Sequence, residues 1–191
     1  MINARGLFKD LFCVKIKYMI NIDSKKYKFC PYCGKNLKTK TEEFKKIQYC
    51  SVCNWIYYPH VGTATGAIII NNNKVLMVKR GREPYKGTWM FPAGFVNYGE
   101  HPEDTLIREV KEETGLMVDK YIYHGLFQAT DDPRSPGHFT IFYKVFSFSG
   151  QIFNNDKDEN MDIKWFFVDD LPDIGWESHK KAAVKLCEGI I

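Results

Sequence analysis

The sequence predicts an α+β protein: a mixed α/β/α sandwich preceded by a small, cysteine-rich module. Between residues 61 and 191, strand-like runs rich in β-branched and aromatic residues stand around two helix-like patterns in irregular order. That order is typical of a mixed sheet covered by helices. Before it, four of the six cysteines form two Cys-x-x-Cys pairs. We therefore expect an N-terminal extension over residues 1–24, a small domain over 25–58 and a main domain over 61–191.

Composition fits this organisation. A chain of 191 residues with 45% hydrophobic and 26% charged residues can bury one full core and carry one appendage. No apolar run reaches the roughly 18 residues that span a bilayer, so no membrane partner is expected. Residues 1–18 lack the features of a secretory signal. We expect translation to begin at Met19, which would make those residues non-native; an organelle-targeting segment is the alternative.

The two cysteine pairs have the spacing of a zinc ribbon. Sixteen residues separate the pairs, which are Cys30 with Cys33 and Cys50 with Cys53. A two-residue gap lets one tight turn aim both sulfurs at a single ion, and Gly34 and Asn54 tolerate the positive φ that such turns need. Four thiolates leave no open position on Zn²⁺, so the zinc is expected to be structural and to stabilise a module too small to fold alone.

Redox-active dithiols are the less favoured interpretation of these cysteines, because neither pair lies in the βαβ pattern of a thioredoxin-type motif. Cysteine pairs of the metal-binding type suit a reducing compartment. We therefore expect the protein in the cytoplasm.

The main domain is expected to hold five strands and two helices. Its patterns predict strands over 63–70, 74–80, 120–127, 139–148 and 163–168. Predicted loops cover 128–138 and 154–160. Pro102 suits the first turn of a helix that stops at Gly115, with an apolar stripe formed by Leu106, Ile107 and Val110. Ser178 is expected to cap a last helix that stops at Gly189.

Three carboxylates stand on one face of the first helix. Glu109, Glu112 and Glu113 lie at i, i+3 and i+4, where like charges cost roughly a few tenths of a kcal/mol per pair. A positive group should offset them, and Mg²⁺, which takes oxygen ligands, is the natural candidate. Glu100 could supply a fourth carboxylate. The alternative is a solvated acidic helix face, the usual fate of a charge run.

The stretch around this helix resembles the signature of the Nudix hydrolases, and we call residues 94–116 the Nudix box. The signature is Gly, five residues, Glu, seven residues, then Arg-Glu-hydrophobic-any-Glu-Glu-any-Gly-hydrophobic. Its positions are occupied here by Gly94, Glu100, Arg108, Glu109, Val110, Glu112, Glu113, Gly115 and Leu116. The preceding cysteines indicate the zinc-ribbon-bearing branch, which includes NADH pyrophosphatases and relatives acting on ADP-ribose or FAD.

This resemblance implies the Nudix fold and hydrolysis of a pyrophosphate bond in a nucleoside diphosphate linked to another moiety. In catalysis, Glu109, Glu112 and Glu113 would hold Mg²⁺ or Mn²⁺ against the diphosphate, and Arg108 would fix the orientation of a box carboxylate. A box carboxylate or a loop acid would orient or deprotonate the attacking water. The loop candidates are Asp158, Glu159 and Asp162.

Candidate substrate contacts lie outside the helix. Arg80 and Arg82 could pair with phosphate oxygens, with a solvated loop as the alternative, and Gly94 belongs to the same predicted set. Tyr85 and Trp89 could stack on a nucleobase, although Trp89 suits the core better.

The predicted loop 128–138 bears on the substrate. NADH pyrophosphatases carry Ser-Gln-Pro-Trp-Pro-Phe-Pro shortly after the box, and the corresponding region 125–136 does not match. Asp132-Pro-Arg134 with His138 instead resembles a loop of ADP-ribose pyrophosphatases, which adds Arg134 to the predicted substrate contacts. The expected substrate is of the ADP-ribose type or a dinucleotide such as FAD or NADH, with release of a nucleoside monophosphate.

Two alternatives stay open. A Nudix-like sensor would bind a nucleotide without turnover, although such proteins usually lose box carboxylates and this chain keeps all of them. An RNA-cap-processing hydrolase would use the basic module, where residues 25–58 hold eight lysines and two glutamates. A small nucleotide-derived substrate is the expected partner, nucleic acid is the less favoured one, and a homodimer is one option for the assembly.

Overall fold

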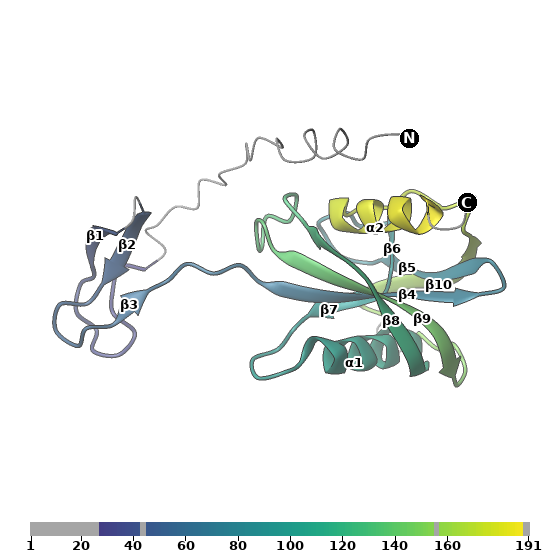
Figure 1. Ribbon diagram of the computed structural model, residues 1–191, viewed down its shortest axis with the longest axis horizontal. Coiled ribbons are helices and arrows are strands. Elements are labelled where there is room, and N and C mark those ends of the chain that lie inside the picture. The colour runs from purple at the N-terminus through teal and green to yellow at the C-terminus, as the bar shows by residue number, and fades with distance from the viewer. Residues whose placement is uncertain (1–26, 43–44, 155–156, 189–191) are drawn as a thin grey trace, which may run out of the picture. The chain divides into compact units, whose positions relative to one another are not determined.

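The computed structural model describes residues 27–42, 45–154 and 157–188, and the chain divides into two compact units between Pro59 and His60 (Figure 1). The predicted extension over 1–24 lies outside the described residues. Within the described ranges, no helix is long and apolar enough to cross a membrane. The two units are described separately.

The first unit is a three-stranded antiparallel sheet. Its strands are β1 (Lys38–Glu42), β2 (Lys45–Tyr49) and β3 (Ile56–Tyr57), in the order β1-β2-β3. One cysteine turn precedes β1 and the other joins β2 to β3. Gly34 has φ 70° and Asn54 has φ 57°, so both adopt the left-handed conformation expected for residues after Cys-x-x-Cys turns.

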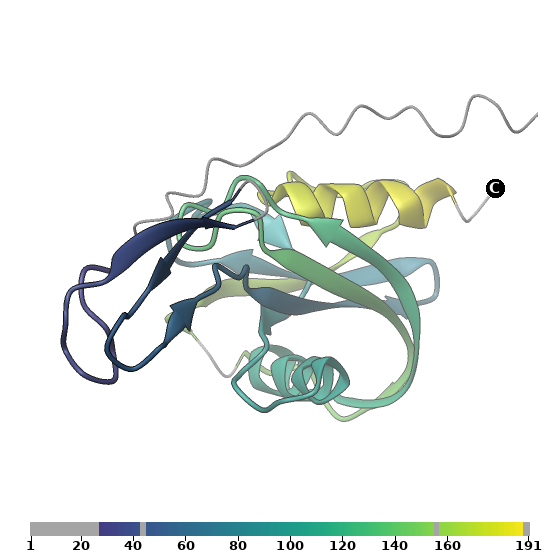
Figure 2. The same cartoon turned by 60° about the vertical axis from the view of Figure 1, so that its left-hand side comes forward.

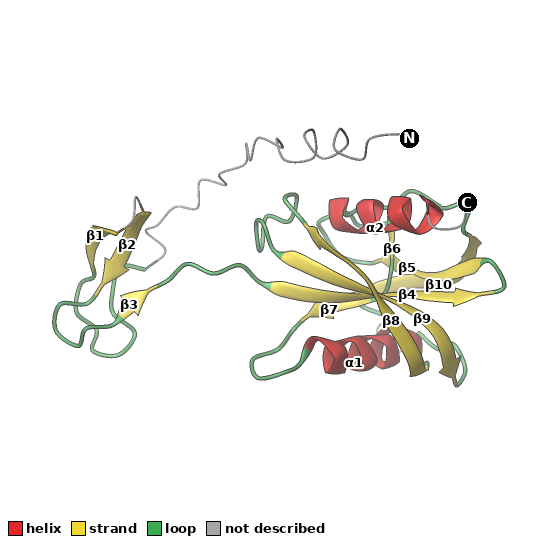
Figure 3. Ribbon diagram, viewed as in Figure 1, coloured by secondary structure: helices red, strands yellow, loops and turns green. Residues whose placement is uncertain are grey.

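The second unit is a mixed sheet between two helices (Figure 3). Its elements are β4 (Thr63–Asn71), β5 (Lys74–Arg80), β6 (Trp89–Met90), β7 (Ala93–Phe95), α1 (Pro102–Thr114), β8 (Met117–Gln128), β9 (Phe139–Ser149), β10 (Asn160–Phe167) and α2 (Glu177–Glu188). The strand order is β10-β5-β4-β9-β8, with β6 beside β5 and β7 beside β4. Only β4 and β9 pair in parallel among the described strands; the other pairs are antiparallel.

Alternating side chains of the central strands build one core on each face of the sheet. On β4, Ile68 packs into the core that includes Ala182 of α2, whereas its neighbour Ile69 packs into the core that includes Val110 of α1. The two helices therefore cover opposite faces of the sheet (Figures 1 and 2). Burial on both faces explains the nearly continuous apolar sequence of β4.

The predicted α/β/α sandwich is confirmed, and most elements lie where expected. The first helix begins at Pro102 and ends before Gly115, whose φ of 75° makes it a left-handed C-cap. Strands β8 and β10 each begin three residues earlier than predicted, at Met117 and Asn160. The short strands β6 and β7 were missed because two or three residues carry no periodic signal.

The prediction that Ser178 caps the last helix was wrong. Helix α2 begins at Glu177, and Ser178 lies buried within it. The Glu177 N–H donates instead to the carboxylate of Asp131, at 2.9 Å, from the loop between β8 and β9. A cap supplied by a distant segment leaves no local sequence signal. The predicted stop at Gly189 lies outside the described residues.

We predict that His179 makes stability fall in acid. Its Nδ1 accepts a hydrogen bond from the Phe91 N–H at 3.2 Å, and burial lowers its pKa to about 3. Because the unfolded chain takes up this proton near pH 6.5 and the folded chain does not, the free energy of unfolding decreases as pH falls from about 6.5 towards 3.

In His179→Asn, the amide oxygen can still accept from Phe91 but does not titrate. Urea unfolding of wild type and variant at pH 7.5 and pH 5 should show a smaller loss for the variant, by about 1–2 kcal/mol. Equal losses would contradict a neutral, buried His179.

Candidate active site and metal centre

A cavity of about 280 Å³ lies beside the Nudix box. It is lined by Ala64, Arg80, Met90, Ala93, Gly94, Phe95, Asn97, Glu109, Glu113, Asp132, Arg134, His138, Thr140, Glu159, Trp176, Ser178 and His179. These residues come from strands β4 to β7 and β9, from α1 and α2, and from connecting segments that hold Asn97, Asp132, Arg134, His138, Glu159 and Trp176. The cavity is thus built where the box meets segments that are distant in the sequence.

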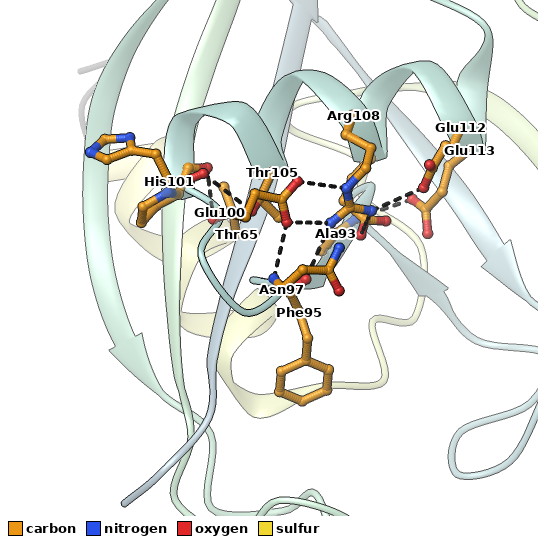
Figure 4. Close-up of polar contacts among 12 residues, drawn as sticks. Thr65, Ala93, Phe95, Asn97, Glu100, His101, Thr105, Arg108, Glu112 and Glu113 are labelled. Carbon is orange, nitrogen blue, oxygen red and sulfur yellow. Dashed lines mark hydrogen bonds and ion pairs between the residues drawn. The ribbon is translucent and has the colours of Figure 1, made fainter.

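Arg108 organises the box through all five of its N–H donors (Figure 4). It pairs bidentately with Glu100, at 2.7 and 2.9 Å. Its Nη1 donates to Glu109 at 2.5 Å and to Glu112 at 3.0 Å, and its Nη2 donates to the Phe95 carbonyl at 3.3 Å. One guanidinium therefore ties the loop before α1 to two carboxylates of the helix.

The loop is also held at its helical junction. Glu100 accepts from the Asn97 N–H at 3.0 Å, and His101 caps α1 by accepting from the Glu103 N–H at 3.3 Å. Hydrogen bonds from Arg108 lower the pKa of Glu100 to about 2, so this carboxylate stays charged. The loop is therefore held both by Arg108 and by the cap at the start of α1.

The three box glutamates on α1 differ in burial. Glu113 is 5% exposed, Glu109 is partly buried, and the side chain of Glu112 is 56% exposed. The Oε2 atom of Glu113 accepts a hydrogen bond from the Ala93 N–H at 3.0 Å. Burial raises the pKa of Glu109, and burial together with the charge of Glu109 raises that of Glu113 well above its usual range. Crowded carboxylates of this kind are stabilised by a cation, and their oxygens are the donors that Mg²⁺ and Mn²⁺ prefer.

Gly94 has a steric reason for its place in the box. A Cβ at this position would overlap the carboxylate of Glu109. Only glycine lets strand β7 approach α1 closely enough for Glu109 to lie against it. Gly94 also lines the cavity, so its expected contact with substrate stays a prediction.

Two arginines line the same cavity as these acids. The guanidinium groups of Arg80 and Arg134 lie 5.2 and 5.4 Å from the ring centre of Trp176. Arg134 pairs with the buried Asp132, which raises the pKa of Arg134. Arg80 is only 4% exposed and donates to the carbonyl of Pro84 at 2.7 Å. Two fixed cations in one cavity can bind a substrate with several negative charges.

Other predicted residues lie elsewhere. Arg82 is absent from the cavity lining and donates to the Asp158 carbonyl at 3.2 Å. Asp162 lies in β10 and pairs with Lys164 at 2.7 Å, which leaves Glu159 as the loop acid on the cavity wall. Two predicted stacking residues serve packing: Trp89 lies edge-on to Phe166, and Tyr85 lies edge-on to Trp176.

Trp176 of the cavity wall and Asp131, which supports it, were not predicted from the sequence. Asp131 accepts from both the Tyr85 hydroxyl and the Glu177 N–H, and so joins three segments around Trp176. Neither Asp131 nor Trp176 belongs to a recognisable motif. Their proximity depends on contacts across 46 residues of sequence, which periodicity does not reveal.

In the first unit, the four cysteine sulfurs gather within 4.8 Å of one another. The separations are 3.4 Å for Cys30 to Cys53, 3.5 Å for Cys33 to Cys50 and 3.8 Å for Cys33 to Cys53. A tetrahedral ZnS₄ site has sulfurs about 3.8 Å apart, whereas a disulfide needs about 2.05 Å. The cluster fits one zinc ion.

Comparisons with known proteins identify the family of this chain. The NUDIX domain family model matches residues 60–186. An ADP-ribose pyrophosphatase of Methanocaldococcus jannaschii is 30% identical over 90% of this chain and 92% of the relative. The NAD-capped RNA hydrolase NudC of Vibrio atlanticus is 29% identical over 77% of this chain, but the match spans only 52% of that relative. The crystal structure of a MutT NUDIX hydrolase from Burkholderia pseudomallei has a TM-score of 0.63 and 26% identity, covering 67% of this chain and 99% of that chain.

An α/β/α sandwich with an intact glutamate-rich box beside a charged cavity defines a Nudix-type hydrolase. The chain belongs to the Nudix family. The preceding four-cysteine cluster is consistent with its zinc-ribbon-bearing branch.

We predict one zinc ion per chain, held by the four-cysteine cluster. Metal analysis should find one equivalent in wild type and much less in Cys30→Ser, because three thiolates and a hydroxyl no longer complete the tetrahedron. Cys187→Ser, which removes an exposed cysteine of the second unit, is the matched control and should keep its zinc. Full zinc in Cys30→Ser would refute this centre.

We predict that Arg108 and Glu100 act as one unit. Arg108→Lys cannot reproduce the bidentate pair and the other three contacts, so kcat should fall at least about tenfold with the fold intact. Because Glu100→Gln weakens the same pair, the double variant should lose much less than the product of the two single losses. Fully multiplicative losses in a double-mutant cycle would show that the two side chains act independently.

Proposed function

We propose that the protein hydrolyses the pyrophosphate bond of an ADP-ribose-type substrate, releasing AMP, with a zinc ribbon over residues 25–58 and the hydrolase domain over 61–191. One observation carries this proposal: the box carboxylates Glu109 and Glu113 and the Arg80–Arg134 pair line one cavity of about 280 Å³. Similarity to the Methanocaldococcus jannaschii ADP-ribose pyrophosphatase over nearly the full length of both chains supports the substrate.

In this proposal, Glu109, Glu112 and Glu113 hold one or more Mg²⁺ or Mn²⁺ ions. Such ions neutralise charge on phosphate oxygens and make bound water more acidic. Arg108 keeps two of these carboxylates aimed in a fixed direction. Phosphoryl transfer depends mainly on positioning and charge neutralisation, so a rigid set of acids and guanidiniums suits it.

The remaining roles follow from position in the cavity. Arg80 and Arg134 bind the phosphate or ribose oxygens of the substrate through guanidinium N–H groups. Glu159, the loop acid on the cavity wall, or a box glutamate accepts the proton of the attacking water. The burial of Arg80 and its bond to the Pro84 carbonyl fix its position before the substrate arrives.

A second candidate is hydrolysis of a dinucleotide such as NADH or FAD, or of a nucleotide cap on RNA. Similarity to a protein named NAD-capped RNA hydrolase favours it, although the match spans about half of that relative. Region 125–136 lacks the Ser-Gln-Pro-Trp-Pro-Phe-Pro motif of NADH pyrophosphatases. We therefore place ADP-ribose first, and a nucleotide sensor without turnover last.

A substrate panel tests the proposal. ADP-ribose, NADH, FAD and NAD-capped RNA should be incubated with the protein and Mg²⁺ or Mn²⁺, with AMP release as the readout. ADP-ribose should give the highest kcat/KM. A clearly higher value for another compound would move the assignment to that substrate, and binding without turnover of any compound would favour a sensor.

We predict that Glu112→Gln lowers kcat by at least about a hundredfold without unfolding the protein. The side chain is 56% exposed, so its loss costs little packing. Asp104→Asn, an exposed acid in the first turn of the same helix, is the matched control and should keep near-wild-type activity. Near-wild-type turnover by Glu112→Gln in excess Mg²⁺ would remove Glu112 from the proposed site.

A further inference from the structure

The first unit carries a cluster of aromatic rings in contact with one another, which we call the aromatic face. It consists of Tyr27, Tyr32, Trp55 and Tyr57. Trp55 lies nearly parallel to Tyr57, at 24° and 6.1 Å between ring centres, and Tyr27 meets Tyr57 edge-on at 4.9 Å. Tyr32 extends the row, 6.4 Å from Trp55.

The aromatic face is held in place by the sheet. Gln48 of β2 is buried, and its side-chain oxygen accepts from the Tyr27 N–H at 3.2 Å while its amide donates to the Tyr27 carbonyl. Gln48 also pairs across the ladder with Tyr57 of β3, so both side chains lie on one face of the sheet. Tyr27 and Tyr57 are therefore positioned before any ligand binds.

Packing of the small unit does not account for the whole cluster. Tyr57 is 7% exposed and belongs to the core, but Tyr32 is 78% exposed and Tyr27 is 41% exposed. The neighbouring Phe29 is 52% exposed as well. Rings that remain this exposed contribute little burial, and contiguous exposed apolar groups commonly mark a binding surface.

The charges beside these rings are positive. Lys46 lies two residues before Gln48 on β2 and so projects from the same face of the sheet. Lys28 follows Tyr27 directly, and its Nζ lies 5.5 Å from the ring centre of Phe29. Residues 25–58 have a formal charge of +6 from eight lysines and two glutamates, and +4 after four thiolates and a zinc ion are included.

We propose that the aromatic face of the ribbon binds single-stranded RNA. Unpaired bases can stack on the exposed rings, and the phosphates of the same strand can pair with the neighbouring lysines. An acidic peptide would match the lysines but not the rings, and duplex RNA hides its bases. The choice of RNA rests on the second candidate function, hydrolysis of a nucleotide cap on RNA, because a capped RNA would bring a single strand to the protein.

The test is a binding assay on the full-length, zinc-loaded protein with a fluorescein-labelled uridine 12-mer in 50 mM NaCl, read as fluorescence anisotropy. Tyr32→Ala should weaken binding at least about fivefold, the loss expected for one stacked base. Tyr32→Phe, which keeps the ring, should bind like wild type. Tyr123→Ala removes a tyrosine of β8 that is 61% exposed, and is the matched control.

The affinity should also fall with salt. About three phosphate contacts give a slope near −2 in a plot of log K against log[NaCl]. Zinc content shows whether each variant is folded. The proposal would be overturned if binding did not saturate or if wild type and Tyr32→Ala had equal affinity. It would also be overturned if polyglutamate displaced the labelled strand as well as an unlabelled uridine 12-mer does.

Hydrolysis of ADP-ribose separates this inference from the proposed function. Tyr32→Ala should keep the wild-type rate, because a small substrate does not need a strand-binding surface. Loss of RNA binding with normal hydrolysis in this variant supports the inference. An inactive wild type that still binds RNA through Tyr32 would contradict the hydrolase proposal alone.

Discussion

The guanidinium of Arg108 is the contact on which the site depends. Its five N–H donors join the Glu100 carboxylate, the Phe95 carbonyl and two glutamates of α1. Three carboxylates around one cation leave a net negative charge. The network therefore fixes the geometry of the acids without neutralising them, which suits a site that must still attract a divalent cation.

The fold places this local network at the wall of a cavity. The core between β4 and α1 positions the acidic helix. Asp131 joins the segments around Trp176, and Arg80 and Arg134 lie against the ring of that tryptophan. The acids come from one continuous motif. The basic wall comes from three separate segments, so it can change without disturbing the box, and differences in substrate among relatives are expected to lie there.

Local patterns in the sequence account for much of this structure. The Nudix box, the helix limits at Pro102 and Gly115, and the grouping of four cysteines each follow from residues close together in the chain. Long-range contacts account for what was missed. Asp131 caps a helix 46 residues away, and Arg82 turns from the cavity to a loop carbonyl 76 residues away. Such pairings are set by tertiary packing, which local propensity does not encode.

The central claim is that the box glutamates hold a divalent cation against the diphosphate in this cavity. Anomalous diffraction from crystals soaked with Mn²⁺ and a non-hydrolysable ADP-ribose analogue tests it most directly. The account predicts manganese bonded to carboxylate oxygens of Glu109, Glu112 or Glu113 and to the diphosphate, with Arg80 or Arg134 contacting the analogue. Manganese bound elsewhere, with the analogue outside the cavity, would contradict it.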